Sequence, residues 1–242
     1  MILTGAGMSS ESGLPTFRGK EGYWVKDGEN YHPMELATSI AFQKIPSTVW
    51  EWYHYRGKVY AEAKPNKGHY AIVELEKYCT EHNKEFLLVT QNVDNLHQKA
   101  GSNPAKIFEV HGNIFSMRCE LACTDDIYPI SEEIIEGVPK CPSCGQNARP
   151  HVLWFDEFYN EIYFKYQSAI QRSREIDLLF VIGTTLQTTL PANILGMAYN
   201  RSIPIIEINP HPLGLDDYGI LVLEGSVGAI FPQIMQELQS SN

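Results

Sequence analysis

The sequence predicts an α/β fold, in which a Rossmann-like parallel sheet carries helices on both faces and a smaller second domain is attached. Two observations predict the sheet. Short, continuous apolar runs such as Phe86 to Thr90 and Leu178 to Ile182 are typical of strands buried on both faces. Segments with apolar residues at helical spacing, such as Gly68 to Lys77, separate these runs. Buried strands that alternate with helices indicate a parallel sheet.

The expected strands end in small or polar residues. The apolar runs that predict strands lie at 2–4, 86–90, 178–182, 203–208 and, more weakly, 219–223. Four of them are followed by, or end in, the segments Gly5-Ala6-Gly7, Gln91-Asn92-Val93-Asp94, Gly183-Thr184-Thr185 and Asn209. Because ligands bind at the carboxyl ends of the strands in an open parallel sheet, we expect these segments to line one crevice.

Two segments interrupt the alternation and predict the second domain. Residues from about 20 to 68 are rich in aromatic side chains and indicate a loop with helices. Residues from about 113 to 150 contain four of the five cysteines. We expect these two insertions to form a small helical and zinc-binding domain. The large Rossmann-like part then comprises residues of about 1–19, 69–112 and 151–242.

The composition is that of an acidic globular protein. Hydrophobic residues make up 43% of the chain, and 29 acidic residues outnumber 19 basic ones. This charge argues against non-specific nucleic-acid binding and favours a basic partner such as a lysine-rich peptide. No apolar run approaches the roughly 20 residues that cross a bilayer, and the apolar start Met1-Ile2-Leu3 is too short for a secretory signal. We therefore expect no nucleic-acid or membrane partner, and a cytoplasmic location.

Four cysteines have the spacing of a zinc site. A Cys-x3-Cys pair is followed by a Cys-x2-Cys pair, at Cys119, Cys123, Cys141 and Cys144. Paired cysteines at close spacing in a reducing compartment indicate a metal rather than disulfides. Four thiolates close a tetrahedral zinc site without an open position, so the expected role of the ion is structural. The alternative is four unrelated cysteines, and the three residues inside the first pair are one more than is common.

Gly5-Ala6-Gly7 predicts a phosphate-binding turn after the first strand. Glycines let the backbone approach a pyrophosphate, and a following helix supplies N–H donors. A tight turn without a ligand is the alternative. The usual dinucleotide fingerprint would have a third glycine where this chain has Ser10, and no acidic residue follows a second strand at the usual distance. An ordinary nicotinamide dehydrogenase is therefore disfavoured.

Three polar side chains are candidates for chemistry. His111, between Val110 and Gly112, has a side chain that can act as a general base near neutral pH. Asn92 and Asp94 are an amide and a carboxylate two residues apart, and they could hold a polar ring and its ribose. A structural role for the histidine and a helix cap for the other two remain the alternatives.

Tyr53 and Arg56 lie three residues apart in an aromatic segment that predicts a helix. This spacing places them on one helix face. A phenol and a guanidinium together suit a carboxylate ligand, because arginine can grip both oxygens. The alternative is an aromatic helix packed on the core, with Arg56 at its rim.

Taken together and in their order along the chain, these residues resemble the sirtuins. The resemblance covers nearly the whole chain, and its specificity lies in the ordered set rather than in any one motif. The matching segments are Gly5-Ala6-Gly7-Met8-Ser9, Gly13-Leu14-Pro15-Thr16-Phe17-Arg18, Thr90-Gln91-Asn92-Val93-Asp94-Asn95-Leu96-His97, Val110-His111-Gly112, the four cysteines, His151-Val152-Leu153-Trp154-Phe155, and Gly183-Thr184-Thr185.

The resemblance implies one sirtuin-type catalytic unit that consumes NAD as a cosubstrate. In that family the acyl oxygen of a modified lysine attacks the nicotinamide ribose and expels nicotinamide. His111 would then act as the base on the ribose hydroxyls. The products would be free lysine, nicotinamide and an O-acyl-ADP-ribose. The expected partners are proteins or peptides that carry acylated lysine, and we expect a monomer.

Carried over position by position, the resemblance implies a role for each site residue. The catalytic residues would be His111, Asn92 and Asp94. The residues against NAD would be Gly5, Ala6, Gly7, Ser9, Thr16, Phe17, Arg18, Gln91, Asn92, Asp94, Gly183, Thr184, Thr185, Asn209 and Val227. The residues against the acyl-lysine would be Tyr53, Arg56, Val152 and Phe155. The ligands of one structural zinc ion would be Cys119, Cys123, Cys141 and Cys144.

Tyr53 and Arg56 match the Tyr-x-x-Arg pattern of the sirtuin class that removes succinyl, malonyl or glutaryl groups. The resemblance therefore implies a preference for acyl chains that end in a carboxylate, beside activity on acetyl groups. One rival is a general deacetylase without this preference. Others are an NAD glycohydrolase or ADP-ribosyltransferase, and a non-catalytic NAD sensor. Asp156 departs from the family, which usually has glycine there, and we expect it to affect the choice of peptide.

Overall fold

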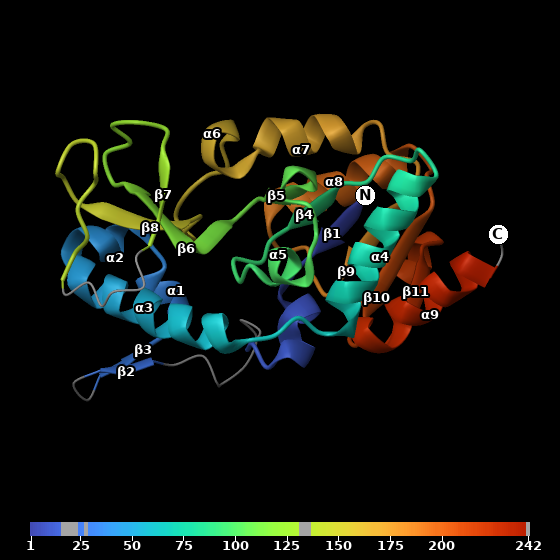
Figure 1. The fold of residues 1–242 in the computed structure, drawn as a ribbon, viewed down its shortest axis with the longest axis horizontal. Coiled ribbons are helices and arrows are strands. Elements are labelled where there is room, and N and C mark those ends of the chain that lie inside the picture. Colours follow the sequence, from blue (N-terminus) through green and yellow to red (C-terminus); the bar gives the residue numbers. More distant parts are fainter. Residues whose placement is uncertain (16–23, 27–28, 131–136, 241–242) are drawn as a thin grey trace.

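The computed structural model of this protein describes residues 1–15, 24–26, 29–130 and 137–240. Its largest element is a six-stranded parallel sheet in the order β11-β10-β9-β1-β4-β5 (Figure 1). Read from β5, this is the doubly wound strand order, which reverses between β1 and β9. The strands are β1 (Ile2–Thr4), β4 (Leu88–Thr90), β5 (Ile107–Glu109), β9 (Leu179–Ile182), β10 (Ile205–Asn209) and β11 (Leu221–Glu224).

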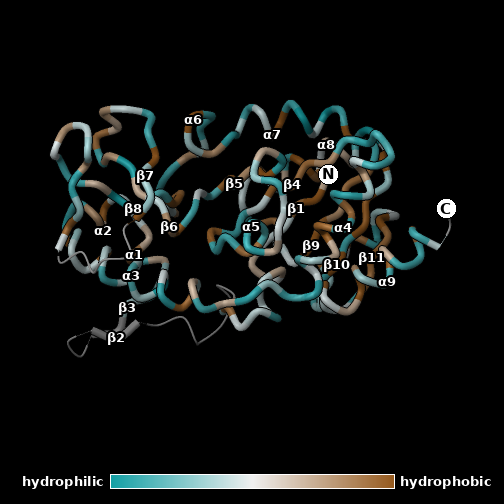
Figure 2. The backbone as a smooth tube through the Cα atoms, in the orientation of Figure 1, coloured by the Kyte–Doolittle hydropathy of each residue, from teal (hydrophilic) through white to brown (hydrophobic). Residues whose placement is uncertain are grey.

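Helices cover both faces of the sheet, as the continuous apolar strands predict. Alternate residues of β1 show why, since Ile2 packs into the core on one face and Leu3 into the core on the other. The first face is covered by α4 (Lys67–Glu81) and α9 (Val227–Ser240), and the second by α7 (Tyr166–Ser173) and α8 (Thr189–Asn200). Figure 2 shows the hydrophobic residues gathered along the sheet, between these two layers.

Four predicted strands and the predicted helix at Gly68 to Lys77 are confirmed at nearly their expected places, and the weaker run at 219–223 forms β11. Helix α4 begins where the side chain of Asn66 accepts hydrogen bonds from the backbone N–H groups of Gly68 and His69, at 2.9 and 3.3 Å. Strand β5 was not predicted, because Ile107-Phe108-Glu109 contains only a two-residue apolar run. The predicted α/β class is confirmed.

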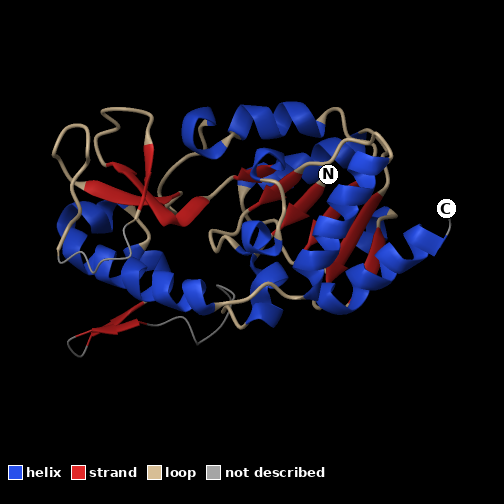
Figure 3. Cartoon of the chain, in the orientation of Figure 1, coloured by secondary structure: helices blue, strands red, loops and turns tan. Residues whose placement is uncertain are grey.

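A second core lies beside the large sheet, at the left of Figure 3. A three-stranded antiparallel sheet, β7-β6-β8, packs there against the helices of the first insertion. Residues of α3 such as Trp50 and Tyr53 pack with Ala148 and Val152 of β8. A short hairpin of β2 (Trp24–Lys26) and β3 (Glu29–Tyr31) precedes the helices and was not predicted. The remaining elements here are α1 (Pro33–Leu36), α2 (Ser39–Lys44), α3 (Pro46–Glu62), β6 (Gly112–Cys119), β7 (Ile127–Pro129) and β8 (Ala148–Val152).

Short elements complete the chain near the strand ends. They are the 3-10 helices η1 (Ala6–Ser12), η3 (Pro104–Lys106) and η4 (Leu215–Tyr218), and the helices α5 (Leu96–Ala100) and α6 (Glu161–Phe164). In the part of the chain that the structure describes, no helix has the length and apolar character needed to span a membrane.

Candidate active site

The turn after β1 and the turn after β9 are locked together at the carboxyl edge of the sheet. The N–H of Gly5 donates to the carbonyl of Ile182 at 3.0 Å, and the N–H of Gly7 donates to the carbonyl of Gly183 at 2.8 Å. A Cβ on Gly183 would lie 2.4 Å from the backbone nitrogen of Met8, and its φ of +56° also favours glycine. The glycines therefore allow a close approach of two backbones at the point where the strand order reverses.

A buried polar cluster lies beside this turn. The Ser9 hydroxyl donates to Oδ2 of Asp94 at 2.6 Å, and Nδ2 of Asn92 donates to the Ser9 oxygen at 3.1 Å. Burial raises the pKa of Asp94, while the hydrogen bonds from Ser9 and from the backbone of Leu96 oppose that rise. Oδ1 of Asp94 accepts from the N–H of Leu96, the first residue of α5, at 2.9 Å, although the N-cap residue itself is Asn95. The Asp94 carboxylate therefore contacts both the start of α5 and the polar cluster.

Gln91, Thr184 and Asn209 join the ends of three strands. Nε2 of Gln91 donates to the Thr184 hydroxyl at 2.8 Å and to the carbonyl of Thr4 at 3.1 Å. Nδ2 of Asn209 donates to the carbonyl of Thr184 at 3.2 Å. The Thr188 hydroxyl donates to Oε1 of Gln91 at 3.3 Å. The predicted convergence of strand-end residues is therefore observed for these side chains.

His111 follows β5 at the same edge. Its carbonyl accepts from the N–H of Leu153 at 2.9 Å, which ties the histidine to the segment after β8. A Cβ on the next residue, Gly112, would lie 2.0 Å from the carbonyl oxygen of His151, so only glycine fits there. Burial lowers the pKa of His111 to about 4, while a hydrogen bond to the backbone of Gln91 opposes the shift. The imidazole is therefore neutral at pH 7 and has a lone pair that can accept a proton.

The segment after β8 connects the site to the small core. Val152, the last residue of β8, is buried, whereas Phe155 is 54% exposed and its N–H donates to the carbonyl of Ala37 at 3.0 Å. The carboxylate of Asp156 accepts hydrogen bonds from the backbone of Ser39 and Ile40, at 2.8 and 3.3 Å. This departure from the family pattern thus has a structural partner, the first turn of α2.

Tyr53 and Arg56 lie on α3, next to this segment. The Tyr53 hydroxyl is buried and accepts from the indole Nε1 of Trp154 at 2.9 Å. The Arg56 guanidinium lies 4.7 Å from the Trp52 ring centroid and 5.9 Å from that of Tyr53, and one of its nitrogens donates to the Tyr60 hydroxyl at 2.5 Å. Tyr53 and Arg56 therefore lie on one helix, as predicted, and the Arg56 guanidinium also packs against aromatic rings of that helix.

The remaining predicted NAD contacts are placed as follows. Ala6, Gly7 and Thr185 are partly exposed at the strand ends. Val227, the first residue of α9, is buried in the core, where its methyl groups lie 2.8 Å from the position of a Cβ on Gly68. Its predicted contact with NAD stays a prediction. Thr16, Phe17 and Arg18 lie outside the described residues.

The four cysteines of the second insertion converge on one point. Their sulfurs all lie within 4.8 Å of one another, although Cys119 and Cys141 are buried and Cys123 and Cys144 are exposed. The Cys119–Cys144 and Cys123–Cys141 sulfur pairs are each 3.6 Å apart. A tetrahedral zinc ion with bonds of about 2.3 Å separates its sulfur ligands by roughly 3.8 Å, which fits this cluster. The donor set of four cysteines is therefore consistent with one zinc ion.

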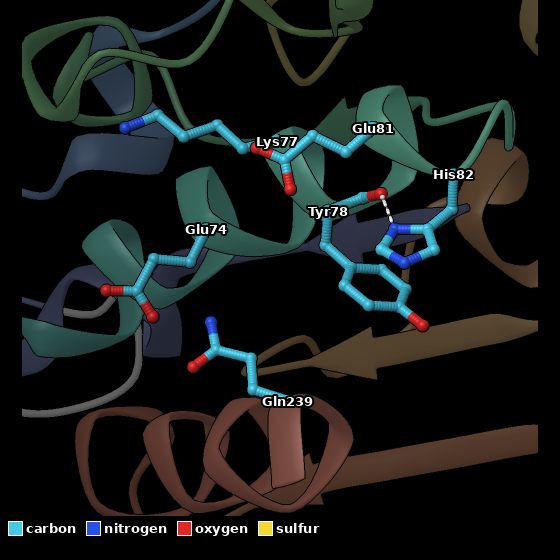
Figure 4. A pocket seen from close by; sticks show the side chains of 6 residues that line it. All are labelled: Glu74, Lys77, Tyr78, Glu81, His82 and Gln239. Carbon is cyan, nitrogen blue, oxygen red and sulfur yellow. Dashed lines mark hydrogen bonds between the residues drawn. The ribbon is translucent and has the colours of Figure 1, made fainter. Parts of the chain in front are cut away.

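A hollow lies between helices α4 and α9 (Figure 4). Its walls come from α4 and the end of α9, at Glu74, Lys77, Tyr78, Glu81, His82 and Gln239. Because α4 runs toward the amino end of β4, its C-terminal half lies far from the strand ends that carry the polar cluster. None of the predicted site residues lines this hollow.

A model of the Sir2 family matches residues 5–189, which is well over half of the chain. The chain belongs to the Sir2 family. A relative from Leptospira interrogans, named NAD-dependent protein deacylase, is 41% identical over 98% of this chain and 91% of its own length. A solved complex of a Sir2 homologue with NAD is 36% identical, with a TM-score of 0.85, over 99% of this chain and 89% of that one. A Sir2–p53 peptide–NAD+ complex is 27% identical, with a TM-score of 0.80, over 99% and 92% of the two chains.

Family membership confirms the resemblance seen in the sequence. The activity in the name of the Leptospira relative is protein deacylation, and that name includes no particular acyl group. Tyr159, whose hydroxyl lies 2.6 Å from Nε2 of His111, is a site residue that the sequence did not indicate. It belongs to none of the motifs that carry the resemblance, and only the fold brings it to the histidine.

Proposed function

We propose that this protein removes acyl groups from protein lysines with NAD as cosubstrate, and that it prefers acyl chains ending in a carboxylate, such as succinyl, malonyl and glutaryl, while also accepting acetyl. NAD dependence and protein deacylation agree with the name of the Leptospira relative. The carboxylate preference is the finer step, and it rests on Tyr53 and Arg56. The products are free lysine, nicotinamide and an O-acyl-ADP-ribose.

The residues gathered at the strand ends suit a dinucleotide. The glycine turn after β1 packs closely on the turn after β9, at the reversal point of the sheet where dinucleotides bind in such folds. NAD supplies the ADP-ribosyl group that receives the acyl chain. Asn92, Ser9 and Asp94 form a fixed polar cluster that can orient ribose hydroxyls and the nicotinamide amide. Gln91 and Asn209 hold the neighbouring turns in place.

His111 has the properties of a general base. Its neutral imidazole can take a proton from a ribose hydroxyl at Nε2, because the backbone of Gln91 holds the other side of the ring. Replacing His111 with Ala should abolish deacylation and leave NAD binding in place. Retained turnover in that variant would remove His111 from this role.

The observation that supports the acyl preference is the position of Arg56 beside Tyr53. Tyr53 contacts Trp154, in the segment that the resemblance places along the acyl-lysine. Among the described residues, no acceptor is seen for the phenol's own proton, so the Tyr53 hydroxyl can donate it to a carboxylate. The guanidinium adds charge-assisted donors, which make stronger hydrogen bonds than neutral ones.

Replacing Arg56 with Met tests this preference. We expect kcat/KM for a succinyl-lysine peptide to fall by about ten- to a hundredfold, because a charge-assisted contact contributes roughly 1.5–3 kcal/mol. Activity on the acetyl form of the same peptide should change only slightly. Lys58→Met is the matched control, since Lys58 is an exposed cation on the same helix. An equal loss on both peptides would assign Arg56 to packing and leave a general deacetylase.

Two other readings remain distinguishable from this one. Nicotinamide release without free lysine would indicate a glycohydrolase or an ADP-ribosyltransferase. Binding of NAD with no nicotinamide release would indicate a sensor. A monomeric state, a cytoplasmic location and the lack of nucleic-acid or membrane partners stay predictions from the sequence.

A further inference from the structure

Tyr159 contacts the candidate base directly. It lies between Phe155 and helix α6, and its hydroxyl is 2.6 Å from Nε2 of His111. The two ring centroids are 5.7 Å apart. Tyr159 comes 48 residues after the histidine in the chain, so the contact depends on the fold that places the segment after β8 beside the end of β5.

The hydrogen-bond partners determine which atom donates. The backbone carbonyl of Gln91 accepts a hydrogen bond from the His111 ring, because a carbonyl oxygen has no proton to give. Nε2 faces Tyr159, so the proton that the carbonyl receives is on Nδ1. In the neutral ring Nε2 then carries the lone pair, and the Tyr159 hydroxyl donates to it. Burial raises the pKa of Tyr159 to about 12, which keeps the phenol protonated at neutral pH.

The Tyr159 side chain is held in place by its neighbours. Thr188 lies beside the Tyr159 hydroxyl and donates its own proton to Oε1 of Gln91 at 3.3 Å. The Tyr159 ring stacks on Tyr166 of α7, with centroids 5.8 Å apart and planes 27° apart. Tyr159 is therefore fixed by its surroundings and does not meet His111 by chance rotation of an exposed side chain.

We propose that Tyr159 is a positioning residue for His111. The Tyr159 hydroxyl holds the neutral imidazole of His111 in one tautomer and occupies its Nε2 until a ribose hydroxyl takes that place. The second half of this proposal rests on the proposed function, because it assigns the proton acceptor in deacylation. The first half concerns only the NAD-free protein. Tyr159 thus keeps the base unprotonated and aligned, and it must give up its hydrogen bond when the substrate arrives.

The surroundings of His111 allow the contact with Tyr159 to be tested by itself. Its pKa depends on burial and on the Gln91 carbonyl, and among the described residues no carboxylate, ammonium or guanidinium group contributes to it. Tyr159 is the titratable side chain that touches the ring. Loss of its hydroxyl leaves the Nε2 lone pair open to a proton, so the charged form becomes easier to reach.

The direct experiment follows the histidine 15N and 1H resonances of the NAD-free protein against pH. The His111 signals are identified by their loss in His111→Gln. We expect wild type to show a protonated Nδ1 and an unprotonated Nε2, with a pKa far below the usual value. In Tyr159→Phe the pKa should rise by about one unit, a tenfold change in proton affinity. Tyr166→Phe keeps the Tyr159 contact and should leave the His111 signals unchanged.

An unaltered His111 pKa in Tyr159→Phe would overturn the proposal. Tyr159→Leu, read at the same resonances, is the second variant if the first does not fold. This measurement needs no turnover, so it stands even if the protein proves not to be a deacylase. In the active enzyme, the acidic limb of the kcat/KM profile for NAD should move to higher pH in Tyr159→Phe by the same amount. A uniform loss without that shift would contradict the positioning role.

Discussion

Asp156 holds Ser39 through both of its carboxylate oxygens. Oδ1 accepts from the Ser39 backbone N–H at 2.8 Å, and Oδ2 accepts from the Ser39 hydroxyl at 2.6 Å. The two residues are 117 positions apart, one in the segment after β8 and the other at the start of α2. These contacts satisfy N–H groups that a helix start leaves without intrahelical partners. They also tie the segment predicted to hold the acyl-lysine to the small core.

A double-mutant cycle measures the interaction between Asp156 and Ser39. Asp156→Ala, Ser39→Ala and the double variant should give a coupling free energy of about 1 kcal/mol or more in urea unfolding, as expected for charge-assisted hydrogen bonds. The peptide KM should rise in Asp156→Ala while the KM for NAD changes little. Additive single effects would show that the contact contributes nothing of its own.

The pair His69 and His97 predicts a loss of stability in acid. Both side chains are buried, and burial lowers the pKa of His69 to about 4 and that of His97 well below its usual value. The unfolded chain takes up protons below about pH 6.5, where the folded histidines do not. The free energy of unfolding should therefore be highest above that pH and fall as the pH drops toward 4.

Urea unfolding at pH 7, 6 and 5 checks this expectation. His69→Gln can still accept from Asn66 but cannot titrate, so its unfolding free energy should depend less on pH, by up to about 1.4 kcal/mol per pH unit. His82→Gln, which removes an exposed histidine, is the matched control. A variant at His69 with an unchanged slope would be the contrary result.

The cysteine cluster predicts one zinc ion per chain with a structural role. Removing it with a chelator should lower the melting temperature and loosen the core around β6 and β8, because a closed four-thiolate site contributes folding free energy. Cys141→Ser should do the same, whereas Cys79→Ala, outside the cluster, should retain the metal. Metal analysis that finds no zinc in the purified protein would defeat this prediction.

Gly183 and Gly196 offer a matched pair for the turn after β9. Alanine at 183 would place its Cβ 2.4 Å from the Met8 nitrogen at a positive φ, whereas alanine at 196, inside α8, meets nothing within 4 Å. Gly183→Ala should cost about 2 kcal/mol or more of stability and weaken NAD binding. Gly196→Ala should stabilise the helix by about 0.5–1 kcal/mol. Thermal unfolding and NAD titration compare the two, and equal behaviour would refute the close-approach argument.

The sequence predicts those parts of this fold that local patterns determine. Continuous apolar runs indicate β1 and β9, since each is buried on both faces and needs apolar residues throughout. Close spacing within each cysteine pair indicates the metal cluster. The short strand β5 was not predicted, because its two-residue apolar run, Ile107-Phe108, does not differ from what loops contain.

Local sequence patterns do not predict contacts between segments that lie far apart in the chain. Asp156 meets Ser39, and Tyr159 meets His111, only because the fold brings separate segments together. Tyr159 belongs to no motif, and its neighbours in sequence give no sign of a partner. Family resemblance implies roles only for residues that match a family pattern, and Asp156 and Tyr159 do not match one.

The most direct test of the central claim uses one peptide in two forms, acetyl-lysine and succinyl-lysine, with NAD and the wild-type protein. Nicotinamide and free lysine are measured for each form. We expect NAD-dependent release of both products, with a clear preference for the succinyl peptide in kcat/KM. Preference for the acetyl peptide would contradict the role given to Tyr53 and Arg56, and nicotinamide release without free lysine would contradict deacylation itself.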